Sequence, residues 1–174
     1  MISWWENKEQ YVILDTETTG LGNDDEIIEI TVVDLDGRVL LDTLVKPTVP
    51  IQQESFEVHG IIEKDVAEAP TFAEIANQLQ QVIAGKTVLI YNDSFDNRMV
   101  YQSAKKYGLE ISLKSNCVME TYAKYYGSFK DNDRSFRRIK LTDASIAEGV
   151  NECQTHRAGG DCHLVRGLIN SISK

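Results

Sequence analysis

Two carboxylates interrupt the segment YVILDTETTGL, residues 11–21, which otherwise has the composition of a buried strand. Residues i and i+2 of a strand point to the same side, so Asp15 and Glu17 project together from its end. Two like charges placed close together are costly unless a positive charge lies between them. A divalent cation such as Mg²⁺ prefers hard oxygen ligands and fits this pair, whereas two side chains in solvent beyond the strand end would need no ion.

A third carboxylate, Asp96, ends the segment NDSFD, residues 92–96, directly after another predicted strand. Ligands gather at such junctions between a strand and a helix in α/β sheets. Simple capping of a helix N-terminus would also favour aspartate at this position, so the spacing alone leaves both interpretations open.

The segment HRAGGDC, residues 156–162, supplies a fourth carboxylate and a histidine. Apolar residues follow Asp161 at four and seven positions, so Asp161 shares the apolar, sheet-facing side of the last predicted helix. A carboxylate on that side needs a partner, and a metal held by Asp15 and Glu17 would serve. His156 lies about one turn upstream, where its imidazole can reach the same place.

The elements that must position these residues alternate between strands and helices. Apolar content and β-propensity predict strands at 11–16, on both sides of the Asp36-Gly37 turn, at 87–92 and at 116–118. Helical periodicity predicts helices at 71–84, 95–107, 119–126, 142–149 and 158–172, with Gly108 and Thr142 as caps. A loop is expected between Pro47 and the VHGI segment. We therefore predict an α/β fold with a mixed five-stranded sheet flanked by helices.

The chain has 174 residues, which is long enough for one sizeable domain. We expect a single domain over residues 1–174, with residues 1–10 as an N-terminal lead. No segment approaches the roughly 18 consecutive apolar residues of a membrane span, and the N-terminus lacks the pattern of a signal peptide. A cytoplasmic protein without membrane contact is the expectation.

The net charge of −9 is unevenly distributed along the chain. Residues 1–93 contain 5 Lys or Arg against 18 Asp or Glu, whereas residues 94–174 contain 13 against 9. The acidic total disfavours nucleic acid, but the second half could present a basic surface. Within it, residues 128–140 interleave basic and aromatic side chains in a way that suits a single strand, although a solvated loop with its phenylalanines packed inward fits equally.

Four motifs occur in one order: DTETTGL with Asp15 and Glu17, VHGI at 58–61, NDSFD ending in Asp96, and His156-x-Ala-x-x-Asp161. Together they resemble the histidine variant of the DEDD-type, DnaQ-like 3′-to-5′ exonucleases. Each motif alone is weak, but the order and the separations are specific, and the resemblance covers roughly residues 11–172. It implies a ribonuclease H-like fold and metal-dependent hydrolysis of phosphodiester bonds from the 3′ end of nucleic acid.

The resemblance also implies roles for these residues. Asp15, Glu17 and Asp161 would hold one Mg²⁺. Asp15 would also contact a second Mg²⁺ that Asp96 supports, and Mn²⁺ would substitute for either ion. His156 would act as the general base, because imidazole side chains accept protons near neutral pH.

By the same resemblance, five residues would line or adjoin the pocket of the terminal nucleotide: Thr16, Thr18, Leu21, His59 and Asn92. For His59, a loop histidine satisfied by backbone hydrogen bonds fits equally. The form of the DTETTGL motif is closer to the proofreading branch than to oligoribonuclease, which favours single-stranded DNA over RNA. A polymerase or another DNA-processing protein is a candidate partner.

Several alternatives stay open. The chain could be an exoribonuclease of the ribonuclease T or oligoribonuclease type, or a non-catalytic nucleic-acid-binding module with the same fold. A structural zinc site would belong to a different class and would use Cys153, His156, Cys162 and His163. Trp4 and Trp5 indicate either a contact surface, such as a homodimer interface, or a packed N-terminal lid.

Overall fold

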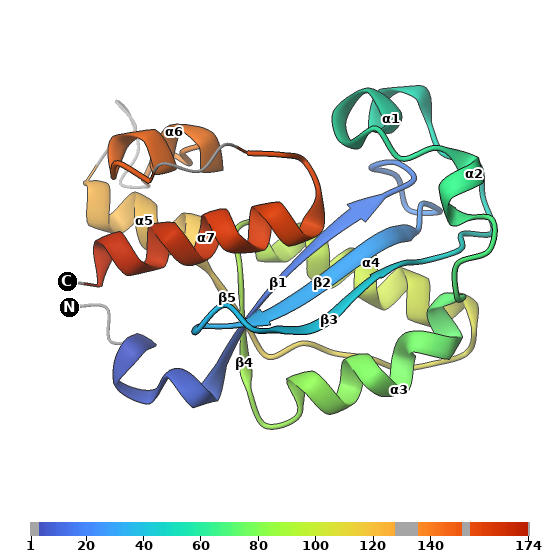
Figure 1. Ribbon diagram of the computed structural model, residues 1–174, viewed down its shortest axis with the longest axis horizontal. Coiled ribbons are helices and arrows are strands. Elements are labelled where there is room, and N and C mark those ends of the chain that lie inside the picture. Colours follow the sequence, from blue (N-terminus) through green and yellow to red (C-terminus); the bar gives the residue numbers. More distant parts are fainter. Residues whose placement is uncertain (1–3, 128–135, 151–153, 174) are drawn as a thin grey trace.

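The computed structural model describes residues 4–127, 136–150 and 154–173, and these form a five-stranded sheet with helices on both faces (Figure 1). The strands are β1 (Tyr11–Thr18), β2 (Ile27–Asp34), β3 (Val39–Leu44), β4 (Thr87–Ile90) and β5 (Ser115–Cys117). Their order across the sheet is β3-β2-β1-β4-β5, which places β1 in the centre. The predicted mixed α/β sheet is confirmed.

The strand directions follow from the connections. β1 to β3 pair as an antiparallel meander, whereas β4 and β5 run parallel to β1. The turn between β2 and β3 is the predicted hairpin, in which Gly37 adopts a φ of +89° and its N–H donates to Asp34 O at 2.9 Å. Gly108, with a φ of +67°, is the predicted cap after the helix that precedes β5.

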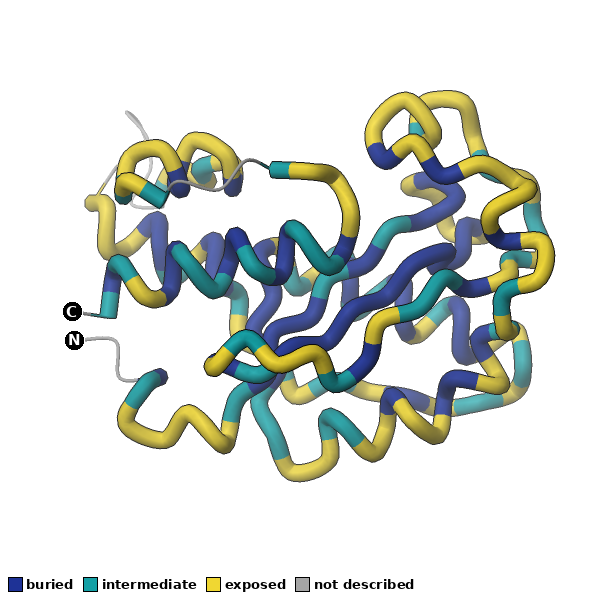
Figure 2. The backbone as a smooth tube through the Cα atoms, in the orientation of Figure 1, coloured by how far each residue is buried: buried dark blue, intermediate teal, exposed yellow. Residues whose placement is uncertain are grey.

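Helices cover both faces of the sheet. They are η1 (Trp4–Gln10, a 3₁₀ helix), α1 (Gln53–His59), α2 (Glu63–Val66), α3 (Phe72–Ile83), α4 (Asp93–Lys106), α5 (Val118–Tyr126), α6 (Leu141–Ala147) and α7 (Ala158–Ile172). α3 and α4 pack on one face, and α5 and α7 pack on the other. Figure 2 shows the central strands almost wholly buried between these two layers, while α1 and α2 lie beyond the end of the sheet toward which β1 runs.

Alternation along β1 decides which layer each of its side chains meets. Val12 and Leu14 pack with α3 and α4, and Ile13 packs with α5 and α7. By the same alternation, Asp15 and Glu17 face the layer that contains α7. The sequence of β1 therefore sends both carboxylates toward one helix.

Two expectations about local structure are wrong. The region expected to be a loop before VHGI contains α1, a seven-residue helix without a side-chain cap at its start that ends at Gly60, whose φ is +71°. Its shortness and weak apolar periodicity conceal it in the sequence. Thr142 does not cap α6, because Lys140 is the N-cap residue and the Thr142 hydroxyl donates to Gln154 instead.

The N-terminal segment packs onto the sheet. Trp4 is buried in the core cluster on the α7 side, and Trp5 is partly buried against the same cluster, which favours the packed lid over an exposed contact surface. Residues 128–135 of the basic and aromatic segment lie outside the described residues. In the part of the chain that the structure describes, no helix combines the length and apolar character needed to cross a membrane.

Candidate active site

Three carboxylates from distant parts of the chain meet at the end of β1. One oxygen each of Asp15, Glu17 and Asp161 lies within 4.8 Å of the others. Asp15 and Glu17 project from the α7-facing side of β1, and Asp161 lies in the first turn of α7. Carboxylate oxygens at these separations suit a hard divalent cation, so these residues could hold a metal.

Asp161 is held in place by the segment that precedes α7. Its carboxylate is 5% exposed and accepts hydrogen bonds from Gln154 Nε2 at 2.9 Å and from the Thr155 N–H at 3.3 Å. Gly160 permits this close approach, because a Cβ at that position would lie 2.0 Å from Thr155 Oγ1. The segment before α7 thus folds back over the carboxylate of Asp161 in the first turn of that helix.

Asp96 reaches the same place from the opposite layer. It lies in the first turn of α4, is 5% exposed, and accepts a hydrogen bond from Thr16 Oγ1 at 2.7 Å. Thr16 faces α4 because its position in β1 alternates with that of Asp15. Carboxylates from β1, α4 and α7 therefore converge at one end of the central strand.

Crowding of these acids raises their pKa values. Burial, followed by the charges of Asp96 and Glu17, holds the pKa of Asp15 well above its usual range. Burial, followed by the charges of Asp161 and Glu29, raises the pKa of Glu17 to about 8. Burial also raises the pKa of Asp96. The pKa values of these acids are raised because burial and the neighbouring acids disfavour their charged forms. A divalent cation among their oxygens would supply a balancing positive charge.

His156 lies at the edge of a cleft of about 480 Å³ that Asp15, Asp96 and Asp161 also line; we call it the carboxylate cleft. The histidine is exposed, and its φ of +50° lies in the left-handed region that side chains rarely adopt. Its neighbours fix this backbone on both sides, because the Thr155 N–H donates to Asp161 and the N–H of residue 158 donates to a buried glutamate. Such strain persists where the surroundings determine the backbone.

That buried glutamate, Glu29, and its partner Arg157 were not found from the sequence. Glu29 lies opposite Glu17 in the β1–β2 pairing and is 5% exposed. Arg157 Nε lies 3.1 and 3.0 Å from the two Glu29 oxygens, its Nη2 also contacts Oε1, and the Ala158 N–H donates to Oε2 at 2.9 Å. The guanidinium relieves a pairing of like charges that would otherwise oppose the sheet. The one available signal was an acidic residue inside the apolar run IIEITVV.

A second hollow, of about 560 Å³, adjoins the carboxylate cleft and shares Thr16 and Phe95 with it. It lies between α1 and the end of β1 with its following loop, and we call it the α1 hollow. Of the five residues predicted to contact substrate, four line this hollow: Thr16, Thr18, Leu21 and His59. Asn92 lines the carboxylate cleft instead.

The ring of His59 is satisfied by the backbone. Its Nδ1 accepts the Ile61 N–H at 3.0 Å, and its Nε2 lies 3.2 Å from Thr18 O. These contacts require the proton on Nε2, and burial lowers the pKa of His59. A neutral imidazole therefore ties α1 to the end of β1, while one side of the residue lines the α1 hollow.

Cys162 is not placed for the zinc alternative. It is fully buried, its Sγ lies 3.6 Å from Thr31 O and 3.9 Å from Ile13 O, and burial raises the pKa of the thiol well above its usual range. His156, by contrast, is exposed at the cleft. Cys153 lies outside the described residues. Among the described residues, the cluster suited to a metal is the acidic one.

Sites for two divalent ions occur in nucleases, polymerases and phosphatases, and hard carboxylate oxygens suit such ions. A model of the exonuclease family, RNase_T, matches residues 12–167. The chain belongs to this exonuclease family, and the predicted nuclease activity and ribonuclease H-like fold are confirmed.

Individual relatives agree with this assignment. The uncharacterized exonuclease CP81 of Escherichia phage 186 is 40% identical over 171 residues, which is 94% of this chain and 88% of that protein. DNA polymerase III subunit epsilon of Pasteurella multocida is 33% identical over 118 residues, or 62% of this chain, and the match spans 47% of epsilon.

Solved structures are similar over most of the chain. Exonuclease X in complex with 5′ overhanging duplex DNA has a TM-score of 0.72 at 25% identity and covers 93% of this chain and 90% of that chain. E. coli exonuclease I in complex with a dA16 oligonucleotide has a TM-score of 0.74 at 15% identity, over 92% of this chain and 40% of that chain. The second similarity supports the fold alone.

The raised pKa of Glu17 predicts a pH-dependent stability of the metal-free protein. A folded-state pKa of about 8, against an ordinary value of 4.5, means that this group's favourable contribution is complete below pH 4.5 and is lost as the pH rises through 8. In EDTA at pH 9, Glu17→Gln should be more stable than the wild-type protein by at least about 1 kcal/mol, or roughly 2–4 °C in Tm. This gain in stability should vanish near pH 4.5. The exposed Glu68→Gln is the control, and the idea fails if both variants show the same pH dependence.

The burial of Glu29 in its pair with Arg157 predicts that substitution of Arg157 destabilises the protein more than substitution of Arg38. Arg157→Ala should lower the free energy of unfolding by on the order of 2–4 kcal/mol, because it leaves a buried carboxylate beside Glu17 without its cation. Arg38→Ala removes the partner of Asp34 from a pair whose arginine side chain is 78% exposed, and it should cost under about 1 kcal/mol. Urea unfolding of both variants measures the difference. Equal losses would mean that Arg157 does not compensate Glu29.

Proposed function

We propose that this exonuclease removes nucleotides from the 3′ end of single-stranded DNA with two Mg²⁺ ions and with His156 as the general base. The observation that carries the proposal is the convergence of four carboxylates at the end of β1, three of which line the carboxylate cleft together with His156. Nuclease activity belongs to the family, whereas polarity, substrate, ions and residue roles are the proposal.

The carboxylates fit a site for two ions by their chemistry. Asp15, Glu17 and Asp161 are proposed to hold one ion, and Asp15 together with Asp96 the other. All donors are hard oxygens, which suit Mg²⁺ and also Mn²⁺. When bound, the two ions supply an activated water, neutralise the phosphoryl oxygens and stabilise the departing 3′ oxygen.

His156 is proposed to accept the proton of the attacking water. Its exposed side chain lines the cleft with three of the four carboxylates. The backbone on each side of it is held by hydrogen bonds to Asp161 and Glu29, which fixes the point from which the imidazole projects. Imidazole groups exchange protons near neutral pH, which suits a general base.

The α1 hollow is proposed to receive the 3′-terminal nucleotide. It shares Thr16 and Phe95 with the carboxylate cleft and is also lined by Glu17, so a nucleotide in it would place its phosphate beside the acids. DNA as the substrate is supported by the similarity to exonuclease X, which has been solved with 5′ overhanging duplex DNA, and the form of the DTETTGL motif favours a single strand. Similarity to the epsilon subunit makes a DNA polymerase a candidate partner.

Digestion of end-labelled oligonucleotides tests polarity and substrate together. With Mg²⁺, 5′-labelled single-stranded DNA should shorten progressively, a 3′ label should be released first, and RNA should be cut more slowly. Asp15→Asn should lower the rate on the order of 10³-fold or more without loss of the fold, because it removes a ligand shared by both ions. The exposed Asp24→Asn should keep wild-type activity.

Each alternative has its own result in that assay. Faster digestion of RNA would identify an exoribonuclease, and release from the 5′ end would refute the polarity. A protein that degrades none of the matched DNA and RNA substrates with Mg²⁺ or Mn²⁺ would be the non-catalytic module.

The proposed role of His156 predicts loss of turnover with retention of metal. His156→Ala should lower kcat by about 10²–10⁴-fold, because the attacking water loses its proton acceptor. Its Mn²⁺ affinity, measured by calorimetry, should stay within about twofold of wild type, since the histidine is not a proposed ligand. His163→Ala, a half-buried histidine on α7, is the control. Wild-type kcat in His156→Ala would assign the base elsewhere.

A further inference from the structure

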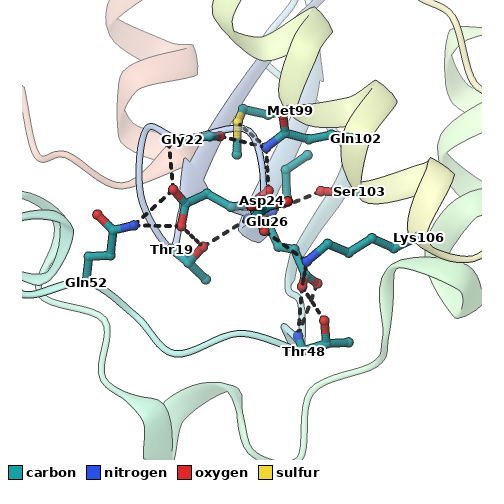
Figure 3. Close-up of polar contacts among 12 residues, drawn as sticks. Thr19, Gly22, Asp24, Glu26, Thr48, Gln52, Met99, Gln102, Ser103 and Lys106 are labelled. Atoms are coloured by element: carbon teal, nitrogen blue, oxygen red, sulfur yellow. Dashed lines mark hydrogen bonds and ion pairs between the residues drawn. The ribbon is translucent and has the colours of Figure 1, made fainter.

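The loop between β1 and β2, residues 19–26, forms one wall of the α1 hollow through Leu21 and Gly22. Figure 3 shows that polar side chains surround this loop, with Gln52 on one side and Gln102 and Lys106 of α4 on the other. Leu21 itself is 74% exposed, so the position of this wall depends on the polar contacts beneath it and not on its own burial.

Asp25 is the centre of these contacts. It is 5% exposed, its Oδ2 accepts the Gly22 N–H at 2.6 Å, and its Oδ1 accepts Thr19 Oγ1 at 2.8 Å. Gln52 Nε2 lies 3.0 Å from both oxygens. Among the described residues, no lysine or arginine forms an ion pair with Asp25, so hydrogen bonds from neutral donors compensate its burial.

Gln52 makes this network a bridge between the two walls of the hollow. It is the N-cap residue of α1 and lines the hollow itself. Its backbone N–H donates to Thr19 O at 2.8 Å while its side chain binds Asp25. Gly20 leaves room for the bridge, because a Cβ there would lie 2.4 Å from the Gln52 side chain and 2.5 Å from Asp25 Oδ2. The separation of the loop from α1 therefore depends on one glutamine and one aspartate.

Three side chains of α4 hold the loop between β1 and β2 through hydrogen bonds to its backbone. Arg98, Gln102 and Lys106 are spaced four residues apart, so they share one side of the helix. The backbone carbonyl oxygens that accept from them belong to Leu21, Gly22, Asp24 and Asp25. The same helix carries Asp96 in its first turn. The wall of the hollow and one carboxylate of the cleft are thus built on a single helix.

We propose that Asp25 is a positioning residue for substrate binding, which sets the width of the α1 hollow and holds the Leu21–Gly22 wall against the terminal nucleotide. The inference rests on the proposed function, because that function places the 3′-terminal nucleotide in this hollow. Asp25 lines neither the hollow nor the carboxylate cleft, so its loss acts through the wall that it holds. Interactions of that kind contribute to binding and leave the chemical step unchanged.

The test separates binding from turnover. In Asp25→Ala, the KM for 5′-labelled single-stranded DNA and the Ki of the product nucleotide dAMP should both rise about tenfold, while kcat and Mn²⁺ affinity stay within about twofold. Asp24→Ala is the matched control, because it removes the same charge from an exposed neighbour that contacts α4 only through its carbonyl oxygen. It should leave KM and Ki unchanged.

Gln52→Ala removes the same bridge from its other end, at an exposed position. It should raise KM and Ki by a similar factor, and the double variant should be no worse than the more affected single variant, since both act on one contact. If Asp25→Ala does not fold, Asp25→Asn, which keeps the side-chain volume and removes one acceptor oxygen from the network, takes its place in the same measurements.

Unchanged KM and Ki in both folded variants, or a fall in kcat at unchanged KM, would overturn the inference. Wild-type protein that fails to digest DNA from the 3′ end would instead refute the proposed function, so the two failures are distinguishable.

Discussion

Repulsion among carboxylates at the end of β1 is the constraint on which the rest of the structure depends. Two unit charges 4.8 Å apart repel by about 3–4 kcal/mol at an effective dielectric constant of about 20. Asp15, Glu17 and Asp161 form three such pairs, and Asp96 adds to them. Whole domains are stable by only about 5–15 kcal/mol, so the ionised cluster needs a counter-charge or retained protons. The raised pKa values of Asp15 and Glu17 mean that these acids tend to retain their protons. A bound cation would instead supply the counter-charge.

The fold meets this constraint by placing the acids on rigid elements from both layers. β1 is the central strand, so its end is accessible to α7 from one face and to α4 from the other. Alternating residues of β1 then serve the two layers, with Asp15 facing α7 and Thr16 donating to Asp96 on α4. Side chains held in this way cannot separate to relieve their repulsion without disrupting the core, which keeps the site organised before any ligand arrives.

Local rules of sequence predicted the acids but not the groups that compensate them. Strand alternation paired Asp15 with Glu17, and helical spacing placed Asp161 on the buried side of α7, because both rules need only neighbouring residues. The contact between Glu29 and Arg157 spans 128 residues and depends on the register of β2 against β1, which no local pattern reports. The same limit hid the bridge from Gln52 to Asp25, which spans 27 residues.

The compensating pair also determines the charge that remains for a ligand. Asp15, Glu17, Asp96, Asp161 and Glu29 would carry five negative charges when ionised, and Arg157 binds the last of them through its guanidinium. Four negative charges are then left around the carboxylate cleft, which equals the charge of the two divalent ions in the proposed mechanism. Without Arg157, a fifth uncompensated carboxylate would lie opposite Glu17, and its repulsion would favour protonation of the acids that are proposed as metal ligands. Arg157 thus neutralises the Glu29 carboxylate where β1 pairs with β2, and in doing so it limits the negative charge around the cleft.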